Sequence, residues 1–311
     1  MFYYYDGEDI WSVASGITND ENEIFPQTII SYEHVDSITP TVFIADPFFI
    51  KHDSLFYLFV EHFVNDQGNI AYFVSDDFKN WKFGGVVIDE PFHMSFPNVF
   101  EDNGDVYMLP EAGASGNVIL YKALSFPDKW VRSDTLIRNV RVKDPALLKK
   151  DGFYYIFCVD RKHVQHVYVS NDLHKGWHEH PASPTGLGNY KRAGGRFIFK
   201  HGNYYLPVQG CEHDYGTSVH LIKIEKITNR EIEISRKNIR YVTPFADMKY
   251  FCYGVHQLDM QKIDGKYYYV IDGRGDPEKG KLVFNVRASI VKNLMDVLDY
   301  MGIYNIPSFL Y

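Results

Sequence analysis

Acidic, basic and amide side chains recur at matching places in this sequence, beside short runs of apolar and aromatic residues. Five of these places, each at the end of such a run, hold Glu61, Glu111, Asp160, Gln209 and Asp272. Five more, each at the start of the preceding run, hold Asp46, Ser95, Asp144, Arg192 with Arg196, and His256. Carboxyl groups in contrasting environments suit glycosidic-bond chemistry, because one must stay ionised as base or nucleophile while another stays protonated as acid.

The polar positions follow an internal repeat. A turn signal with an aromatic strand pattern after it begins at Asp53, Gly104, Gly152, Gly202 and Gly265, at spacings of 51, 48, 50 and 63 residues. A tryptophan marker runs in step at Trp81, Trp130 and Trp177. Four strand patterns in about 50 residues are typical of one propeller blade. The sequence therefore predicts an all-β fold, a five-bladed β-propeller.

In the first repeat we expect strands at 43–50, 55–60, 70–75 and 81–88. Residues 1–40 carry a weaker strand pattern that either closes the ring or caps one face. Apolar residues at helical spacing from 288 to 301 predict a short C-terminal helix. Residues 226–251 hold either a charged insertion or an extended fourth strand. We expect one domain over 1–311, with blades at about 40–285 and a helical tail at 286–311.

Both sets of polar positions are expected on one rim of the propeller. The innermost strand of each blade lines the channel and forms a hairpin with the second strand, so its start lies beside the end of that strand. Convergence of the repeated acids on one opening favours a functional site. Structural explanations stay open for single residues. An Asp before proline can bind backbone N–H groups, His256 can be a core histidine, and Arg192 and Arg196 can be counter-charges.

Composition limits the partners and the compartment. The formal net charge of −8 argues against a nucleic-acid partner, which needs a basic face. Three cysteines without CxxC spacing predict free thiols in a reducing compartment. The N-terminal residues show no secretory signal and no stretch is apolar enough for a membrane span, so we expect a cytoplasmic protein.

No cofactor and no metal ligand set is predicted. The sequence lacks the phosphate-binding loop Gly-x-x-x-x-Gly-Lys-Ser/Thr, the nucleophile elbow Gly-x-Ser-x-Gly and a His/Cys cluster with metal-ligand spacing. A divalent cation in the central channel, held through water by His256 and the acids, stays open.

Several blocks of the sequence resemble one protein family. They are Ala45-Asp-Pro-Phe, Met94-Ser-Phe-Pro-Asn-Val-Phe, Tyr107-Met-Leu-Pro-Glu-Ala, Lys143-Asp-Pro-Ala-Leu, Arg192-Ala-Gly-Gly-Arg, and Gln209 with Tyr215-Gly. Over residues 40–275 they resemble the amino-terminal domain of glucosamine inositolphosphorylceramide transferases and its bacterial stand-alone relatives. The resemblance implies a five-bladed propeller similar to glycoside hydrolase family 43.

The likeness to family 43 implies catalytic roles for Asp46, as base, and for Asp144, as the group that adjusts a pKa. At the position where those hydrolases carry the Glu that acts as general acid, this sequence has Arg192 and Arg196 instead. Glu111, on another blade, is therefore the candidate for the general acid. Two arginines suit a phosphate group through bidentate contacts. We predict substrate-binding roles for Glu61, Ser95, Asp160, Arg192, Arg196, Gln209, Tyr215, His256, Asp272 and Arg274.

These residues indicate a protein that acts at a glycosidic bond. Because the relatives are associated with surface glycans and glycolipids, the resemblance implies sugar transfer in cell-surface polysaccharide or glycolipid synthesis. The expected substrate is a sugar or nucleotide sugar, and partner glycan-synthesis enzymes could take part. Two alternatives stay open, a glycoside hydrolase of the family 43 type and a propeller that binds glycans without turnover.

Overall fold

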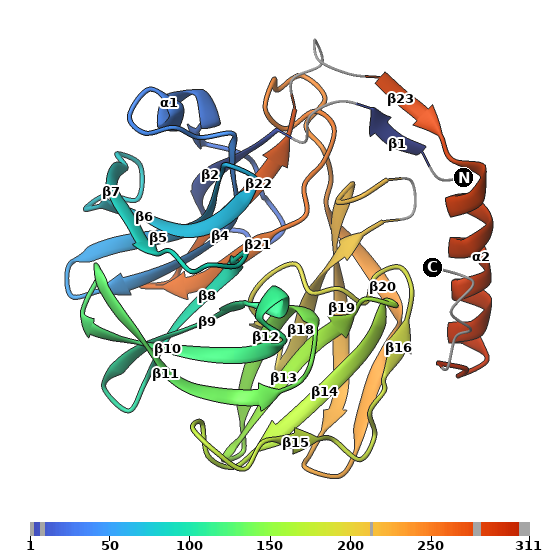
Figure 1. The fold of residues 1–311 in the computed structure, drawn as a ribbon. Coiled ribbons are helices and arrows are strands. Elements are labelled where there is room, and N and C mark those ends of the chain that lie inside the picture. Colours follow the sequence, from blue (N-terminus) through green and yellow to red (C-terminus); the bar gives the residue numbers. More distant parts are fainter. Residues whose placement is uncertain (1–2, 7–9, 212–213, 276–280, 305–311) are drawn as a thin grey trace.

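A computed structural model describes residues 3–6, 10–211, 214–275 and 281–304. Over these residues, five blade-like sheets stand around a central axis, which confirms the five-bladed propeller (Figure 1). In each blade one edge strand of the sheet lies nearest the axis, and its neighbours follow outward. The repeated turn and strand patterns of the sequence therefore correspond to blades.

Four blades are built from consecutive strands. The first holds β4 (Phe43–His52), β5 (Leu55–Val64), β6 (Gln67–Ser75) and β7 (Lys82–Ile88). The second holds β8 (Ser95–Asp102), β9 (Asp105–Glu111), β10 (Asn117–Ser125) and β11 (Lys129–Arg138), with the 3-10 turn η1 (Gly113–Ser115). The third holds β12 (Val142–Lys150), β13 (Phe153–Asp160), β14 (Val164–Ser170), β15 (His178–Glu179) and β16 (Gly186–Leu187). The fourth holds β17 (Ile198–Lys200), β18 (Asn203–Gly210), β19 (Ser218–Ile227) and β20 (Ile232–Val242).

The fifth blade joins the two ends of the chain. Its inner strands are β21 (Leu258–Ile263) and β22 (Lys266–Arg274), and its outer strands are β2 (Trp11–Thr18) and β3 (Thr28–Ile30). Strand β2 pairs antiparallel with β22 along its whole length, from Trp11 opposite Arg274 to Thr18 opposite Tyr267. The segment before residue 40 therefore closes the ring. Blade structure begins at Trp11 rather than near residue 40, because these strands bury Val13 and Ala14 completely.

Aromatic side chains fill the space between neighbouring blades. Phe48 and Phe96, from the innermost strands of the first two blades, meet edge to face with ring centres 4.8 Å apart. Phe157 and Phe197 make a similar contact between the third and fourth blades, at 5.2 Å. Burying one such side chain fully contributes about 1.5–3 kcal/mol, so these contacts help to hold the blades in a fixed ring.

The remaining elements lie outside the ring. The predicted C-terminal helix is α2 (Val286–Tyr300), whose Met295 packs on Val164 and on Leu187 of the third blade (Figure 1). Strand β1 (Tyr3–Asp6) pairs with β23 (Lys281–Phe284), and a short helix α1 (Tyr32–Asp36) follows β3. Eleven residues of 226–251 form the long strand β20, which confirms the extended fourth strand. Within the described residues, no helix is long and apolar enough to cross a membrane.

Candidate functional site

One mouth of the ring holds a cavity of about 720 Å³. Seven of the side chains singled out in the sequence line it: Asp46, Glu61, Ser95, Glu111, Arg192, Tyr215 and His256. Trp11, Phe43, Phe63, His93 and Lys143 also line it and were not singled out. The expectation that distant polar positions converge on one opening is therefore confirmed for these seven residues, while their roles stay predictions.

Four more of the singled-out residues lie buried around this cavity or support its walls. Asp144, Gln209 and Asp272 are at most 1% exposed. Arg274 is also buried, donates to Asp214 Oδ2 over 2.6 Å and lies 5.7 Å from the Trp11 ring. These four side chains position the residues that face the cavity rather than facing it themselves.

Arg196 does not lie at this cavity, so its expected placement beside Arg192 was wrong, and Asp160 lies at the end of β13 as expected but does not line the cavity. Arg196 donates to Asp259 on the fifth blade and to the backbone carbonyl of Val99 on the second, and it lines a separate cavity of about 180 Å³. Asp160 accepts the backbone N–H groups of Lys162 and Val164 in the turn after β13. Both residues therefore have the structural role that the sequence had left open.

The innermost strands of the first three blades share a bulge beside the cavity. Asp46, Phe96 and Asp144 each precede a proline and have positive φ values of 51°, 49° and 48°. The pairing of β4 with β5, β8 with β9 and β12 with β13 shifts register at these points. A bulge redirects the side chain of its extra residue, and a non-glycine residue keeps a positive φ only where its surroundings hold it.

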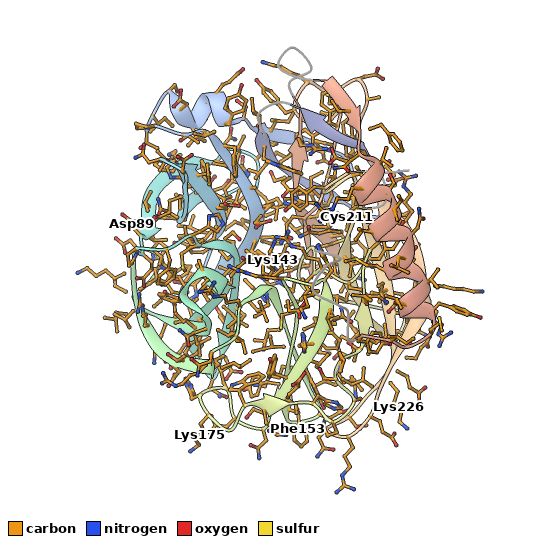
Figure 2. The ribbon with its side chains drawn as sticks, turned by 45° about the vertical axis from the view of Figure 1, so that its right-hand side comes forward. Asp89, Lys143, Phe153, Lys175, Cys211 and Lys226 are labelled. Atoms are coloured by element: carbon orange, nitrogen blue, oxygen red, sulfur yellow. The ribbon has the colours of Figure 1, made fainter. Side chains whose placement is uncertain are left out.

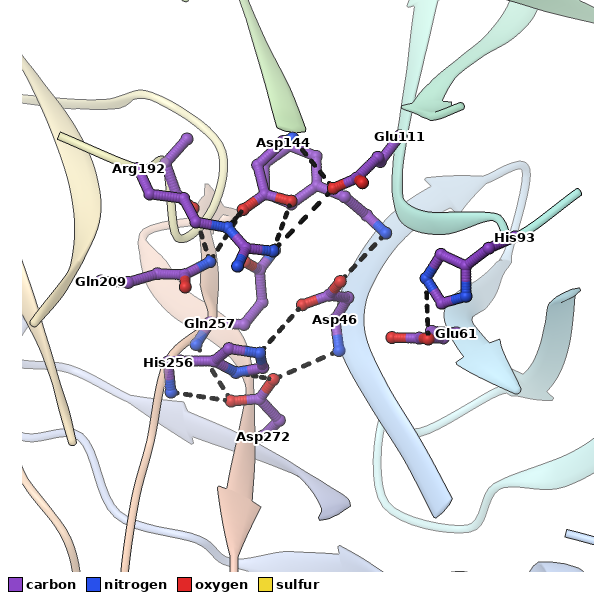
Figure 3. A network of polar contacts seen from close by, with 12 residues as sticks. Asp46, Glu61, His93, Glu111, Asp144, Arg192, Gln209, His256, Gln257 and Asp272 are labelled. Carbon is purple, nitrogen blue, oxygen red and sulfur yellow. Dashed lines mark hydrogen bonds and ion pairs between the residues drawn. The ribbon is translucent and has the colours of Figure 1, made fainter. Parts of the chain in front are cut away.

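Carboxylates hold these bulges in place across blade boundaries (Figure 3). Asp272 Oδ2 accepts the backbone N–H of Asp46 over 3.2 Å, and Asp46 Oδ2 accepts that of Phe96 over 3.1 Å. Glu111 Oε2 accepts the N–H of Asp144 over 3.3 Å. Asp46 and Glu111 therefore bind backbone groups and face the cavity at once, so the structural and chemical interpretations hold together for these two acids.

Asp144 and Glu111 lie in contrasting electrostatic environments. Arg192 pairs with both oxygens of Asp144, through Nε to Oδ2 and through Nη2 to Oδ1 at 3.2 Å. Burial alone would raise the pKa of Asp144, but the Arg192 guanidinium outweighs it and lowers that pKa. Burial, followed by the charge of Asp144, raises the pKa of Glu111 well above its ordinary value. The pair thus offers one ionised and one protonated carboxyl group.

A second group of carboxylates surrounds His256. Its Nδ1 lies 2.6 Å from Asp272 Oδ2, and its Nε2 lies 3.5 Å from Asp46 Oδ1. Burial tends to lower the pKa of His256, but the charge of Asp272 outweighs this and raises it. Burial raises the pKa of Asp46 to about 6, although the His256 charge opposes the rise. The imidazole stacks on Trp11, with ring centres 4.1 Å apart, so its orientation is fixed.

Glu61 pairs with His93, which the sequence did not single out. The backbone N–H of Gly68 donates to His93 Nδ1 over 3.1 Å, so the neutral imidazole carries its proton on Nε2, 3.4 Å from Glu61 Oε1. Burial and the charge of Asp46 raise the pKa of Glu61 well above its ordinary value. His93 lies before β8, in the connection between the first two blades. None of the repeated turn or tryptophan positions falls in this connection, so the sequence pattern could not have identified His93.

Gly68 lets these two side chains approach the backbone. A Cβ there would lie 2.4 Å from the carbonyl oxygen of Met94 and 2.7 Å from Glu61 Oε1. We expect Gly68→Ala to lower the free energy of unfolding by about 1–3 kcal/mol, because backbone and a buried carboxyl must shift. Urea unfolding measures this, with Gly84→Ala as a comparison in which Tyr72 side-chain atoms are the nearest neighbours. An unchanged free energy of unfolding for Gly68→Ala would show that Glu61 and the Met94 carbonyl can move aside for a methyl group.

With this geometry in place, comparison with known proteins places the chain in a family. Residues 14–274 match the family model described as glucosamine inositolphosphorylceramide transferase 1, N-terminal. The chain belongs to this family. Glucosamine inositolphosphorylceramide transferase 1 of Oryza sativa subsp. japonica is 30% identical over 298 residues, which cover 87% of this chain and 39% of the rice protein. The protein of the same name from Arabidopsis thaliana is 30% identical over 242 residues, covering 73% of this chain and 31% of that protein.

The family match covers the whole cavity except Trp11, but the curated relatives are much longer than this chain. This member of the family spans about two fifths of the rice protein. Among solved structures, a thermostable family-43 glycoside hydrolase superposes with a TM-score of 0.53 at 17% identity, covering 78% of this chain and 93% of that one. At that identity the likeness concerns the fold. The predicted resemblance to the transferase domain and to the family 43 fold is confirmed.

Proposed function

We propose that this member of the family transfers a sugar in the synthesis of a cell-surface polysaccharide or glycolipid. The observation that carries the proposal is the contrast between Asp144 and Glu111, one held ionised by Arg192 and the other held protonated by burial. Carboxyl groups separated in this way divide the acid and base roles of glycosidic-bond chemistry between them. Phe43, Phe63 and Tyr215 are partly exposed and add aromatic surface to the same cavity, which suits the faces of a sugar ring.

In this proposal Glu111 is the general acid and donates its proton to the oxygen of the leaving group. Asp46 is the base or nucleophile on the sugar or on the incoming hydroxyl group. A carboxyl with a pKa of about 6 is ionised at neutral pH and still accepts a proton readily, which is the compromise that general-base catalysis favours. Asp144 adjusts the pKa of Glu111 through its charge, and Arg192 keeps Asp144 ionised.

Product analysis separates sugar transfer from its alternatives. The protein is incubated with a panel of nucleotide sugars and an inositol phosphate acceptor, and products are identified by mass spectrometry. We expect a glycosylated acceptor. Free sugar alone would assign a hydrolase, and saturable binding in calorimetry without product would assign a glycan-binding module. The matched control is Asp264→Asn, which removes an exposed carboxylate in the β21–β22 turn and should leave turnover unchanged.

Partner glycan-synthesis enzymes form a further part of the proposal. The proposed reaction consumes an activated sugar donor and yields a glycosylated acceptor. We therefore infer that a separate enzyme supplies the donor or receives the product. No disulfide joins Cys158, Cys211 and Cys252, which is consistent with the cytoplasm as the proposed compartment.

We propose that the reaction uses no metal ion bound directly by Asp46, His256 and Asp272, although one ligand atom of each lies within 4.8 Å of the others. Asp272 Oδ1 already accepts the backbone N–H groups of His256 and Gln257 over 3.0 Å, and Oδ2 accepts that of Asp46. Direct coordination would have to displace contacts that hold the bulge. Asp272 therefore serves these backbone groups rather than a cation, which leaves Asp46 Oδ1, without a hydrogen-bond partner among the described residues, and His256 too few to hold one directly.

Dialysis against EDTA tests this part of the proposal. We expect turnover with nucleotide sugars to be unchanged after dialysis, because both oxygens of Asp272 already accept backbone N–H groups. Thermal unfolding measured in parallel should show no shift on adding back Ca²⁺ or Mg²⁺. Loss of turnover that either ion restores would assign a cation to the channel instead.

A further inference from the structure

Lys143 places an ammonium group in the wall of the cavity. The residue lies on β12, immediately before the bulge at Asp144, and it is only partly exposed (Figure 2). Within the described part of the chain, no carboxylate lies within ion-pair distance of its Nζ and no hydrogen bond from it is found. A partly buried lysine is normally paired, because removing its charge from water is unfavourable unless an anion compensates.

Arg192 adds a second cationic group on the same side of the cavity. Its Nε and Nη2 are bound to Asp144, whereas Nη1 has no hydrogen-bond partner among the described residues. The side chain is 16% exposed and lines the cavity together with Lys143. Tyr215 covers the guanidinium at 5.3 Å and holds it in position. Two N–H donor groups on neighbouring blades therefore face the same space without having their hydrogen-bonding capacity filled.

The charges of the cavity are divided between its two sides. Asp46, Glu61 and Glu111 belong to the first two blades, and Lys143 and Arg192 lie on the third and fourth (Figure 3). The charge of Arg192 and then burial lower the pKa of Lys143, even though Glu111 and Asp144 oppose this. Burial is the main cause that lowers the pKa of His93, and the charges of Arg192 and Lys143 lower it further. The side formed by Lys143 and Arg192 therefore has a positive local potential and would be stabilised by an added anion.

We propose that Lys143 and Arg192 bind a phosphate ester of the substrate and leave its sugar ring against Tyr215 and the carboxyl groups of the cavity. The inference rests on the proposed function and narrows its substrate class to phosphorylated sugars or their conjugates. Two sources share this chemistry, the diphosphate of a nucleotide sugar and the phosphodiester of an inositol phosphate headgroup. The phosphate pair expected from the sequence, Arg192 with Arg196, is thereby replaced, because Arg196 is bound to Asp259 away from the cavity.

Titration calorimetry with defined phosphate compounds tests the proposal on the full chain. The probes are inorganic diphosphate, guanosine and uridine diphosphates, and inositol 1-phosphate. We expect Lys143→Met to weaken binding of the tightest probe about tenfold or more, the loss typical of one charge-assisted hydrogen bond. Lys143→Arg should retain most of the affinity. Lys266→Met removes an equal charge from the exposed β21–β22 turn and should bind like the wild type.

The comparison among probes identifies the source of the phosphate. Tighter binding of a nucleoside diphosphate than of inorganic diphosphate supports a nucleotide sugar, and tighter binding of inositol 1-phosphate supports a lipid headgroup. Absence of binding by every probe, or equal affinities for Lys143→Met and the wild type, would overturn the site. Folding does not confuse the result, because removing an unpaired and partly buried charge should leave urea unfolding unchanged or shift it to higher urea.

This test is independent of sugar transfer. Phosphate binding that depends on Lys143, without any glycosylated product, would leave the anion site standing and remove the transfer reaction. Transfer from a donor without phosphate, unaffected by Lys143→Met, would keep the transfer reaction and remove the anion site.

Discussion

Replacing Asp46 by Asn should reduce turnover by about a hundred- to ten-thousandfold, the range that general acid–base groups contribute. The same change should raise the free energy of unfolding at pH 8. Asn fits the site, because it tolerates the positive φ of 51° and its Oδ1 can accept the Phe96 N–H as the carboxylate does. Its amide nitrogen would face His256 Nε2, which accepts a hydrogen bond when the imidazole is neutral.

The gain in stability follows from the direction of the Asp46 pKa shift. Burial raises this pKa from 3.8 to about 6, so between these values the folded protein keeps a proton that the unfolded chain has lost. The folded state is therefore progressively destabilised as pH rises from about 4 to about 6, and the loss is complete above pH 6. A shift of this size corresponds to about 3 kcal/mol at most, which Asp46→Asn would recover at pH 8 and not at pH 4.

Urea unfolding at pH 4 and pH 8, together with initial rates across the same range, measures both effects. For the wild type we expect rates to rise through a pKa near 6 as Asp46 ionises. Asp264→Asn should change neither the rates nor the difference in stability between the two pH values. Full activity in Asp46→Asn would remove this residue from the mechanism, and lower stability at pH 8 would show that its charge is compensated in the fold.

The blades could be predicted from the sequence because their turns depend on backbone conformations that few residues adopt. Asp53, Gly104, Gly152, Gly202 and Gly265 all have positive φ, between 50° and 90°, which favours Gly and Asp. Gly or Asp therefore recurs at the turn between the first two strands of each blade. Closure of the ring by β2 could only be suggested, because pairing Trp11 with Arg274 is a long-range contact without a local signal.

The site was predicted best where the repeat is regular and worst where it breaks. In the first three blades the residue before proline marks the bulge, which places Asp46 and Asp144 correctly. The fourth blade has no such bulge, and its innermost strand begins only at Ile198. Residues 192–196 run along the channel instead, with Gly194 and Gly195 so close to β21 that a Cβ on Gly195 would lie 1.8 Å from the carbonyl oxygen of Leu258. The two arginines therefore end in different cavities, although only three residues separate them.

Arg192→Met should be the most destabilising substitution in the cavity. Asp144 is fully buried and would lose its only charged partner within ion-pair distance among the described residues. Removing one partner of a buried ion pair costs about 3–5 kcal/mol, and Met replaces the stem of Arg192 without its charge. Because Arg192 lowers the pKa of Asp144 in the wild type, the loss should be large at pH 8 and shrink towards pH 4, where Asp144 of the variant takes up a proton.

The double variant Asp144→Asn/Arg192→Met decides whether the loss comes from an isolated charge or from packing. Asn tolerates the φ of 48° at this position, and its Oδ1 can still accept the hydrogen bond from Gln209 Nε2. If the uncompensated carboxylate is the cause, the double variant should be more stable than Arg192→Met and its stability should depend less on pH. Equal stability of the two variants in urea would assign the loss to the guanidinium's contacts with Tyr215 and the channel wall.

The double variant should also lose turnover, whichever of the two stability results is found. Glu111 loses the neighbouring negative charge of Asp144, which helps to raise its pKa. The general acid therefore becomes ionised at lower pH.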